Sequence, residues 1–155
     1  MLNVALAKGR LADSCADIFI KCGIRAGILK EETRKLVLET PDKAFSFFFV
    51  KPADVPTYVE DGIADIGIGG KDTLLEAEAD LYEMLDLNFE RCKLCVAGFP
   101  SMKNFADAAH LRVATKYAHT AKKLFSSRGA DAEIIKLNGS IELAPLTGLA
   151  DVIFD

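Results

Sequence analysis

Short apolar runs alternate with amphipathic stretches along the whole chain. A short apolar run bounded by turn residues is typical of a buried strand, whereas apolar residues that recur every three or four positions form one face of a helix. This alternation favours an α/β fold with mostly parallel sheets and flanking helices. The pattern predicts strands at residues 2–6, 34–39, 45–50, 64–68, 93–97, 112–115, 133–137 and 150–154, and helices at residues 11–22, 55–60, 117–127 and 141–146 and from about residue 72.

One segment occurs twice in similar form, as residues 61–68 (DGIADIGI) and residues 147–154 (TGLADVIF). Each copy follows a predicted short helix and enters a predicted buried strand. Two lobes of similar design with a cleft between them would explain the repeat, and a common helix-to-strand turn would explain it equally well.

The composition narrows the range of partners. With 155 residues, half of them hydrophobic, the chain can form one domain or two small lobes with a proper core. A formal net charge of −4 and the absence of a long basic run argue against a nucleic-acid-binding protein. Any phosphate ligand must therefore be met by a local cluster of cations. The N-terminus lacks the order of a signal peptide, and no apolar stretch reaches membrane-spanning length, so we expect a cytoplasmic protein without a membrane partner.

Four cysteines raise the question of a zinc or redox site. Cys92 and Cys95 fall in an apolar run that we interpret as a strand, where residues three apart face opposite sides and do not easily share a ligand. Structural zinc would also need a second pair of ligands. Cys15 and Cys22 have helical spacing and are expected in the core. The sequence therefore predicts no metal site.

Two turns are candidates for anion binding, because each follows a strand and precedes a helix. Lys8-Gly9-Arg10 places two cations and a flexible backbone at the end of the first strand. Gly67-Ile68-Gly69-Gly70 opens from a later strand, and its glycines would let backbone amides approach a ligand near a helix N-terminus. The alternatives are a solvated loop for the first and a tight structural turn for the second.

Four further charged residues are candidates for contact with a phosphorylated sugar. Glu142 lies on the helix before the last strand and Asp155 at the end of that strand, and we expect both to face one cleft. Such carboxylates can accept hydrogen bonds from ribose hydroxyls, help to hold Mg²⁺ through pyrophosphate oxygens, or stabilise an oxocarbenium-like transition state. Arg34 and Lys51 each lie beside an apolar strand and could bind phosphate from their own lobe or from a neighbouring subunit. Solvated surface groups are the alternative for Glu142 and Asp155.

Several spaced features extend over essentially the whole chain: residues 5–11 (ALAKGRL), 54–56 (DVP), 61–70 (DGIADIGIGG) and 112–117 (RVATKY), and the spacing Glu142, Gly148, Ala150, Ile153, Asp155. In this order they resemble the ATP phosphoribosyltransferase of histidine biosynthesis. The resemblance implies a fold similar to type II periplasmic binding proteins, with a first α/β lobe at residues 1–90 and a second at residues 91–155. It also implies a glycosyltransferase that moves the 5-phosphoribosyl group of phosphoribosyl pyrophosphate to N1 of ATP and releases pyrophosphate, with Mg²⁺ as cofactor.

The resemblance also implies a subunit arrangement. The segment between Gly70 and Arg91 is short and no C-terminal regulatory domain follows, which resembles the short form of the family. That form implies a catalytic homodimer within a hetero-oligomer, together with a regulatory subunit that resembles histidyl-tRNA synthetase.

The residues that match the family's motifs take the roles that the family implies. Lys8 and Arg10 match cations near the triphosphate and pyrophosphate, and Arg34 matches an arginine at the pyrophosphate. The other matches are Gly69 and Gly70 at the nucleotide-side turn, Tyr117 near adenine, and Glu142 and Asp155 at the ribose. Gly9 and Lys51 are expected to bind substrate as well.

Two positions depart from the family. Lys51 stands where arginine is usual, so a bidentate fork becomes a point charge. Ala118 replaces the proline that commonly follows the tyrosine, which loosens the backbone predicted at the helix start.

In the family, the residues that follow the position of Asp155 form a Thr-Gly-x-Thr-Leu loop that holds the 5-phosphate. We therefore expect the second lobe to be incomplete at its C-terminus, and phosphoribosyl pyrophosphate to bind weakly or not at all to a chain that ends at Asp155. Two alternatives remain: an inactive fragment of the enzyme, and a non-catalytic binding module of the periplasmic-binding-protein type, whose Gly-x-Ala-Asp-Ile-Gly step is present at residues 62–67. A passive binder would not need both Lys8-Gly9-Arg10 and the spacing from Glu142 to Asp155.

Overall fold

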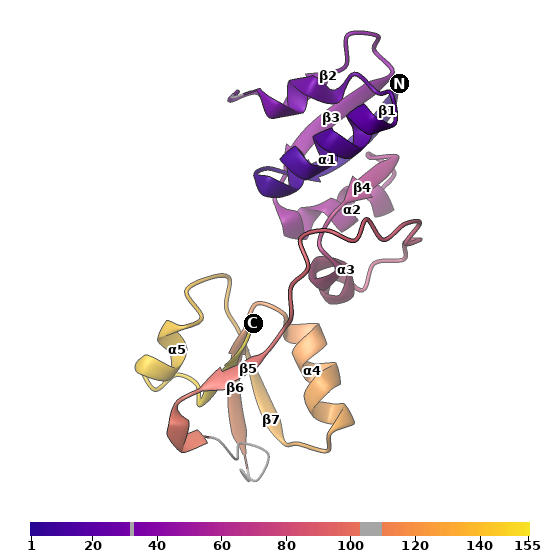
Figure 1. The fold of residues 1–155 in the computed structure, drawn as a ribbon. Helices are drawn as coiled ribbons and strands as arrows, with labels where there is room; N and C mark the ends of the chain where they lie inside the picture. The colour runs from indigo at the N-terminus through magenta and orange to yellow at the C-terminus, as the bar shows by residue number, and fades with distance from the viewer. Residues whose placement is uncertain (32, 103–109) are drawn as a thin grey trace. The chain divides into compact units, whose positions relative to one another are not determined.

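A computed structural model describes residues 1–31, 33–102 and 110–155 of the chain. Its internal contacts divide it into two compact units, Met1–Arg91 and Cys92–Asp155 (Figure 1). Each unit has its own four-stranded sheet and its own hydrophobic core. The boundary between the two lobes that the sequence predicts, after residue 90, lies one residue before the observed boundary between the units.

The sheet of the first unit has the strand order β2-β3-β1-β4. β1 lies in its interior and pairs in parallel with β3 on one side and with β4 on the other, while β2 is an antiparallel edge strand. The bounds are Leu2–Ala7 for β1, Val37–Glu39 for β2, Phe45–Val50 for β3 and Ile66–Ile68 for β4.

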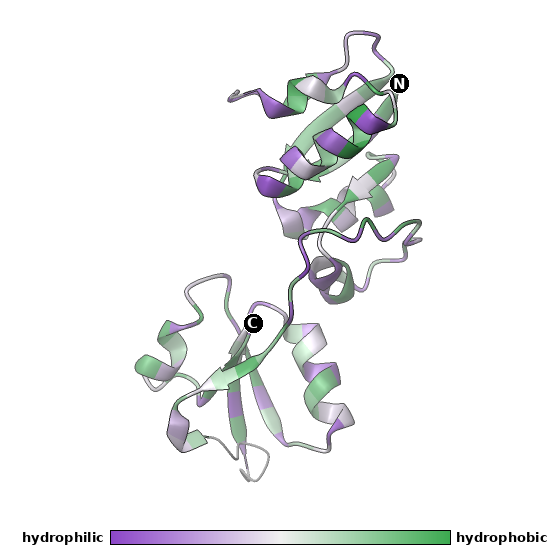
Figure 2. Ribbon diagram, in the orientation of Figure 1, coloured by the Kyte–Doolittle hydropathy of each residue, from purple (hydrophilic) through white to green (hydrophobic). Residues whose placement is uncertain are grey.

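Alternate residues of β1 supply two cores, because successive side chains of a strand point to opposite faces. Val4 and Leu6 pack with α1 and with Phe47 on one face, and Ala5 packs with Val55 of α2 on the other. Figure 2 shows hydrophobic and hydrophilic residues interleaved along α1, as expected for a helix with one buried side. The helices of this unit are α1 (Arg10–Lys21), α2 (Val55–Glu60) and α3 (Lys71–Ala77), with 3₁₀ turns η1 (Ala26–Lys30) and η2 (Pro52–Asp54).

The second unit repeats this plan with the strand order β5-β8-β6-β7. β6 pairs in parallel with β7 and β8, and β5 is the antiparallel edge strand. Val113 packs toward Phe125 of α4, and Ala114 packs toward Ala144 of α5. The bounds are β5 Val96–Gly98, β6 Leu111–Thr115, β7 Ala132–Lys136, β8 Val152–Phe154, α4 Ala118–Ser127, α5 Leu143–Leu146 and η3 Pro100–Met102.

The α/β class with mostly parallel sheets is therefore confirmed, and most predicted elements lie within two residues of their observed bounds. β2 and β5 each begin three residues later than predicted, at Val37 and Val96. The 3₁₀ turns were not predicted, because their short apolar stretches lack a helical period.

The cysteine prediction needs two corrections. Cys92 and Cys95 both precede β5 and are exposed, so the argument that they occupy opposite faces of one strand is wrong. Cys15 is buried, and burial raises the pKa of its thiol to about 11, but Cys22 is exposed at the end of α1 rather than in the core. Within the described ranges, no group of three or more His, Cys, Asp or Glu side chains is placed to hold a metal ion.

None of the helices in the described part of the chain is long and apolar enough to cross a membrane.

Candidate functional site

Most of the basic residues predicted for the site lie at one edge of the first unit's sheet. Three parallel strands end there together, because Ala7 is in register with Val50 and Leu6 with Ile68. Lys8, Lys51 and Gly69 are the residues that immediately follow these strands. β2 runs in the opposite direction and begins at this edge, since Val37 is opposite Phe48, so Arg34 approaches the same edge.

Lys8 has a defined place at this edge. Its Nζ donates to the carbonyl oxygen of Thr33 at 3.3 Å and lies 5.4 Å from the centroid of the Phe49 ring. It lines a shallow pocket of about 200 Å³ together with Gly9, Asp13, Lys30 and other residues. No ion pair to Lys8 is found among the described residues, so its charge is available to an anion.

The next two residues give the turn its shape. Gly9 has φ 99° and ψ −152°, a backbone conformation that L side chains rarely adopt. Its carbonyl oxygen accepts hydrogen bonds from the amides of Ala12 and Asp13, at 2.8 and 3.3 Å, which starts α1. Arg10 is 88% exposed and its guanidinium lies 3.6 Å from the Glu90 carboxylate. An exposed pair of this kind is weak and leaves Arg10 able to turn toward a ligand.

Gly67, Gly69 and Gly70 differ in how closely their surroundings pack against the position of a side chain. A Cβ on Gly67 would lie 2.7 Å from Val59 Cγ2 and 2.9 Å from Val55 Cγ1, so this glycine lets α2 pack on β4. A Cβ on Gly70 would lie 2.2 Å from Asp72 Oδ1, whereas a Cβ on Gly69 would make an ordinary contact at 3.9 Å. Close packing therefore explains Gly67, whereas a Cβ on Gly69 would meet only an ordinary contact.

The second unit places Asp155 next to a lysine that the sequence analysis did not select. Lys116 follows β6 and Asp155 follows β8, and these strands are parallel neighbours. The Lys116 Nζ lies 3.2 Å from Asp155 Oδ1 and 4.9 Å from the centroid of the Tyr117 ring. The rule that singled out Lys8, a cation directly after a strand, would have found Lys116 as well.

Tyr117 is part of the core rather than of an open surface. It is 8% exposed and packs with a cluster that includes Val113 and Phe125. Its amide donates to Thr115 Oγ1 at 2.9 Å, and α4 begins directly after it although residue 118 is alanine. Its role beside adenine stays a prediction, and only a small part of the ring is accessible for it.

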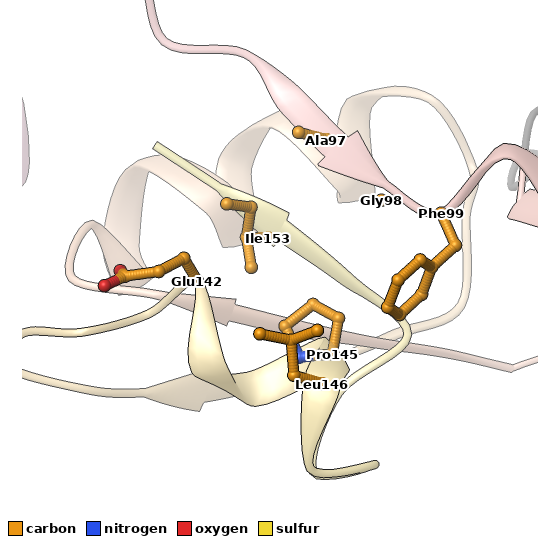
Figure 3. Close-up of a pocket in the computed structure, with 7 residues that line it drawn as sticks. All are labelled: Ala97, Gly98, Phe99, Glu142, Pro145, Leu146 and Ile153. Atoms are coloured by element: carbon orange, nitrogen blue, oxygen red, sulfur yellow. The ribbon is translucent and has the colours of Figure 1, made fainter.

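Glu142 is exposed at the start of α5 and lines a hollow of about 230 Å³. Figure 3 shows its carboxylate pointing away from Phe99 and Leu146. The loop that precedes it leaves the sheet beside β6, since the Leu137 amide donates to the carbonyl oxygen of Thr115 at 2.9 Å. That Glu142 and Asp155 act on one ligand stays a prediction. The other residues lining the hollow are Ala97, Gly98, Pro145 and Ile153.

Comparison with known proteins identifies relatives over the whole chain. The sequence profile described as "HisG: ATP phosphoribosyltransferase" matches residues 51–155. The ATP phosphoribosyltransferase of Alkaliphilus metalliredigens is 53% identical over 155 residues, which are 100% of this chain and 74% of that protein. The enzyme of the same description from Caldanaerobacter subterraneus subsp. tengcongensis is 50% identical over 100% of this chain and 73% of its own length.

A solved structure is also similar. It is described as the ATP phosphoribosyl transferase (HisG:HisZ) complex from Thermotoga maritima, and the matched chain has a TM-score of 0.78 and 35% identity. The match covers 100% of this chain and 73% of that one.

Proposed function

The chain belongs to the ATP phosphoribosyltransferase family, and we propose that it carries out that family's reaction, the first step of histidine biosynthesis. In this reaction, a glycosyl transfer, the bond from the anomeric carbon of phosphoribosyl pyrophosphate to the pyrophosphate oxygen breaks. A bond from that carbon to N1 of ATP forms, with inversion, and pyrophosphate leaves. The observation that carries the assignment of residues is the convergence of Lys8, Lys51 and Arg34 on one sheet edge.

The basic residues of the first unit would bind the phosphate groups of the substrate. Lys8 has a neutral partner and Arg10 has only a weak, exposed one, so both can turn to phosphate oxygens with little loss of protein contacts. Together with Arg34 and Lys51 they would stabilise the negative charge that develops on the leaving pyrophosphate. Backbone amides near Gly9 and Gly69 would be further donors to phosphate at the same edge. The nucleophile is a nitrogen of ATP, so no side chain needs to form a covalent bond to the sugar.

The second unit acts on the sugar. The carboxylates of Asp155 and Glu142 would accept hydrogen bonds from ribose hydroxyls and stabilise positive charge at the anomeric carbon. Tyr117 would contribute the edge of its ring beside adenine. These roles rest on the match of each residue to the family's motif.

Mg²⁺ is the cofactor that the family implies. The described residues offer no cluster of three ligands, which fits an ion that reaches the site with its phosphate oxygens and is held mainly by them. When bound, it would neutralise part of the leaving-group charge. Lys8 and Arg10 would then hold the remaining pyrophosphate oxygens.

The partner proposal extends from the Thermotoga maritima neighbour, which is described as a HisG:HisZ complex. We infer that this chain forms a homodimer that assembles with a regulatory subunit of the same type in the cytoplasm. Co-purification of the chain with such a subunit, followed by measurement of the mass of the complex, tests this assembly.

Replacement of Lys8 tests the proposed reaction. Lys8→Met should raise the KM for phosphoribosyl pyrophosphate at least about tenfold in an assay of phosphoribosyl-ATP formation, because one charge-assisted contact is lost. Lys21→Met, which changes an exposed lysine in the last turn of α1, is the matched control and should behave as the wild type. Absence of turnover by the wild type with its regulatory subunit would contradict the proposed reaction and favour the inactive fragment or the non-catalytic binding module.

A further inference from the structure

Lys116 and Asp155 form an ion pair at the point where two parallel strands of the second unit end. β6 and β8 are in register at Ala114 and Ile153, so residues 116 and 155 are neighbours at the carboxyl edge. The Lys116 Nζ lies 3.2 Å from Asp155 Oδ1, and the two side chains are 47% and 43% exposed. The pair thus lies outside the core.

An aromatic ring holds Lys116 from a second direction. Its Nζ lies 4.9 Å from the Tyr117 ring centroid, within the range of a cation–π interaction. Tyr117 cannot shift easily, because its ring is packed in the core and its amide is bonded to Thr115. The core thus fixes the ring, and the ring restricts where the ammonium group lies beside Asp155.

The backbone of Asp155 is also fixed. Its carbonyl oxygen accepts from the Cys95 amide at 2.7 Å, and its amide donates to the Cys95 carbonyl oxygen at 3.1 Å. The remaining freedom of Asp155 is the rotation of its side chain, and the Lys116 contact restricts that rotation.

Lys8 in the first unit has surroundings similar to those of Lys116, but it has no carboxylate partner among the described residues. Lys8 also directly follows a strand that lies between two parallel neighbours, and its ammonium also lies near an aromatic ring, that of Phe49. Its other contact is the neutral carbonyl oxygen of Thr33, so its charge remains available to a ligand. In the second unit the corresponding charge is directed at a carboxylate.

We propose that Lys116 is a positioning residue for Asp155. Its ammonium group occupies Oδ1, so that the side chain is held in one rotamer and Oδ2 is left to accept a hydrogen bond from a ribose hydroxyl. This inference rests on the proposed function, because it concerns how one predicted substrate contact is aimed. It differs from direct binding of phosphate by Lys116, which would not depend on Asp155.

A double-mutant cycle tests the proposal. Lys116→Met, Asp155→Asn and the double variant are compared with the wild type, together with its regulatory subunit, by kcat and KM for phosphoribosyl pyrophosphate and by calorimetric titration with this donor. Lys116→Met should lower kcat/KM roughly 5- to 20-fold in the wild-type background and less than about twofold in the Asp155→Asn background. Lys116→Arg should recover most of the loss, because it keeps a cation within reach of Asp155.

The control is Lys122→Met, an exposed lysine on α4, which should leave kcat/KM unchanged. Equal losses from Lys116→Met in both backgrounds would overturn the proposal and indicate that Lys116 contacts the substrate itself. No loss from Lys116→Met in an active, normally folded protein would also overturn it. If the wild type neither binds the donor nor turns over, the proposed function fails, and this inference fails with it.

Discussion

The two units contain the same helix-to-strand turn but hold it differently. In the first unit the Asn3 amide donates to Asp65 Oδ2 at 2.7 Å, and the Asp65 amide donates to the Asn3 carbonyl oxygen at 2.9 Å. In the second unit the Arg112 amide donates to Asp151 Oδ2 and the Asp151 amide donates to the Arg112 carbonyl oxygen, both at 2.9 Å. The repeated sequence segment is therefore a repeated structural element, one per unit.

The difference lies in the residue on the neighbouring strand. Arg112 adds a two-pronged contact to the Asp151 carboxylate, at 2.7 and 3.2 Å, and donates to the carbonyl oxygen of Gly148 at 2.8 Å. Hydrogen bonds from the Arg112 side chain and backbone lower the pKa of Asp151. The two hydrogen bonds between the aspartate and the backbone of the neighbouring strand are thus common to both turns, and the ion pair is an addition in the second unit.

Core substitutions should have the largest effect and should show whether the two units are independent. Phe47 and Phe125 are almost fully buried in the first and second unit respectively, so changing either to alanine should destabilise its own unit by about 3–5 kcal/mol. Hydrogen exchange measured by peptide should show lost protection only within Met1–Arg91 for Phe47→Ala and only within Cys92–Asp155 for Phe125→Ala. Equal loss in both units would mean that they unfold together.

Gly67 is the position at which the two turns differ most in packing, because Ile153 occupies the equivalent place in the second unit. Gly67→Ala should destabilise the first unit by about 1–3 kcal/mol, since the new methyl group would overlap Val55 and Val59. Gly69→Ala is the matched control and should cost little, because its Cβ would make only a normal contact. Denaturant unfolding measures both, and equal costs would contradict the packing explanation.

Changing Asp65 and Asp151 to asparagine should separate the effect of the hydrogen bond that both turns share from the effect of the ion pair with Arg112. Asn keeps an acceptor for the backbone amide, so Asp65→Asn should change the melting temperature little. Asp151→Asn also removes the ion pair with Arg112 and should lower the melting temperature by roughly 2–4 °C. Because the Asp151 pKa is depressed by folding, this difference should be present above the ordinary pKa of Asp and vanish as the pH falls through the folded-state value. A larger effect from Asp65→Asn would contradict the comparison.

The smallest expected effect is a pH dependence confined to the second unit, which contains both histidines of the chain, at positions 110 and 119. His110 Nδ1 lies 3.0 Å from Asp131 Oδ2 and its Nε2 lies 3.5 Å from Glu133 Oε2. The hydrogen bond to Asp131, and to a smaller extent the one to Glu133, raises the pKa of His110. The resulting stabilisation should be full below the ordinary pKa of His, about 6.5, and be lost as the pH rises through the folded-state value.

The measurement is the difference in melting temperature between the wild type and His110→Gln across that range. The difference should shrink toward alkaline pH, and the effect should be abolished in Asp131→Asn combined with Glu133→Gln. A constant difference across the range would show that protonation of His110 does not contribute.

Most of the fold could be predicted, because local patterns set it. Phe45–Val50 and Val55–Glu60 were predicted at their observed bounds, since an apolar run and a proline-started helix each act over a few residues. β5 was predicted too early because it begins opposite Phe154, the last residue of its partner strand, and no local pattern shows that. β2 was also predicted too early, and it begins at Val37 opposite Phe48, two residues before β3 ends.

For the candidate site, the sequence by itself determined which residue types follow each strand, because strand ends are marked by local changes from apolar to charged residues. These residues include Lys8, Gly9, Arg10, Lys51 and Asp155. Only the tertiary structure decided which of these residues are neighbours, since the order of strands in a sheet depends on long-range pairing. That pairing brought Lys51 and Arg34 to the edge of Lys8, put Lys116 beside Asp155, and buried the ring of Tyr117 in a core that its sequence context did not reveal.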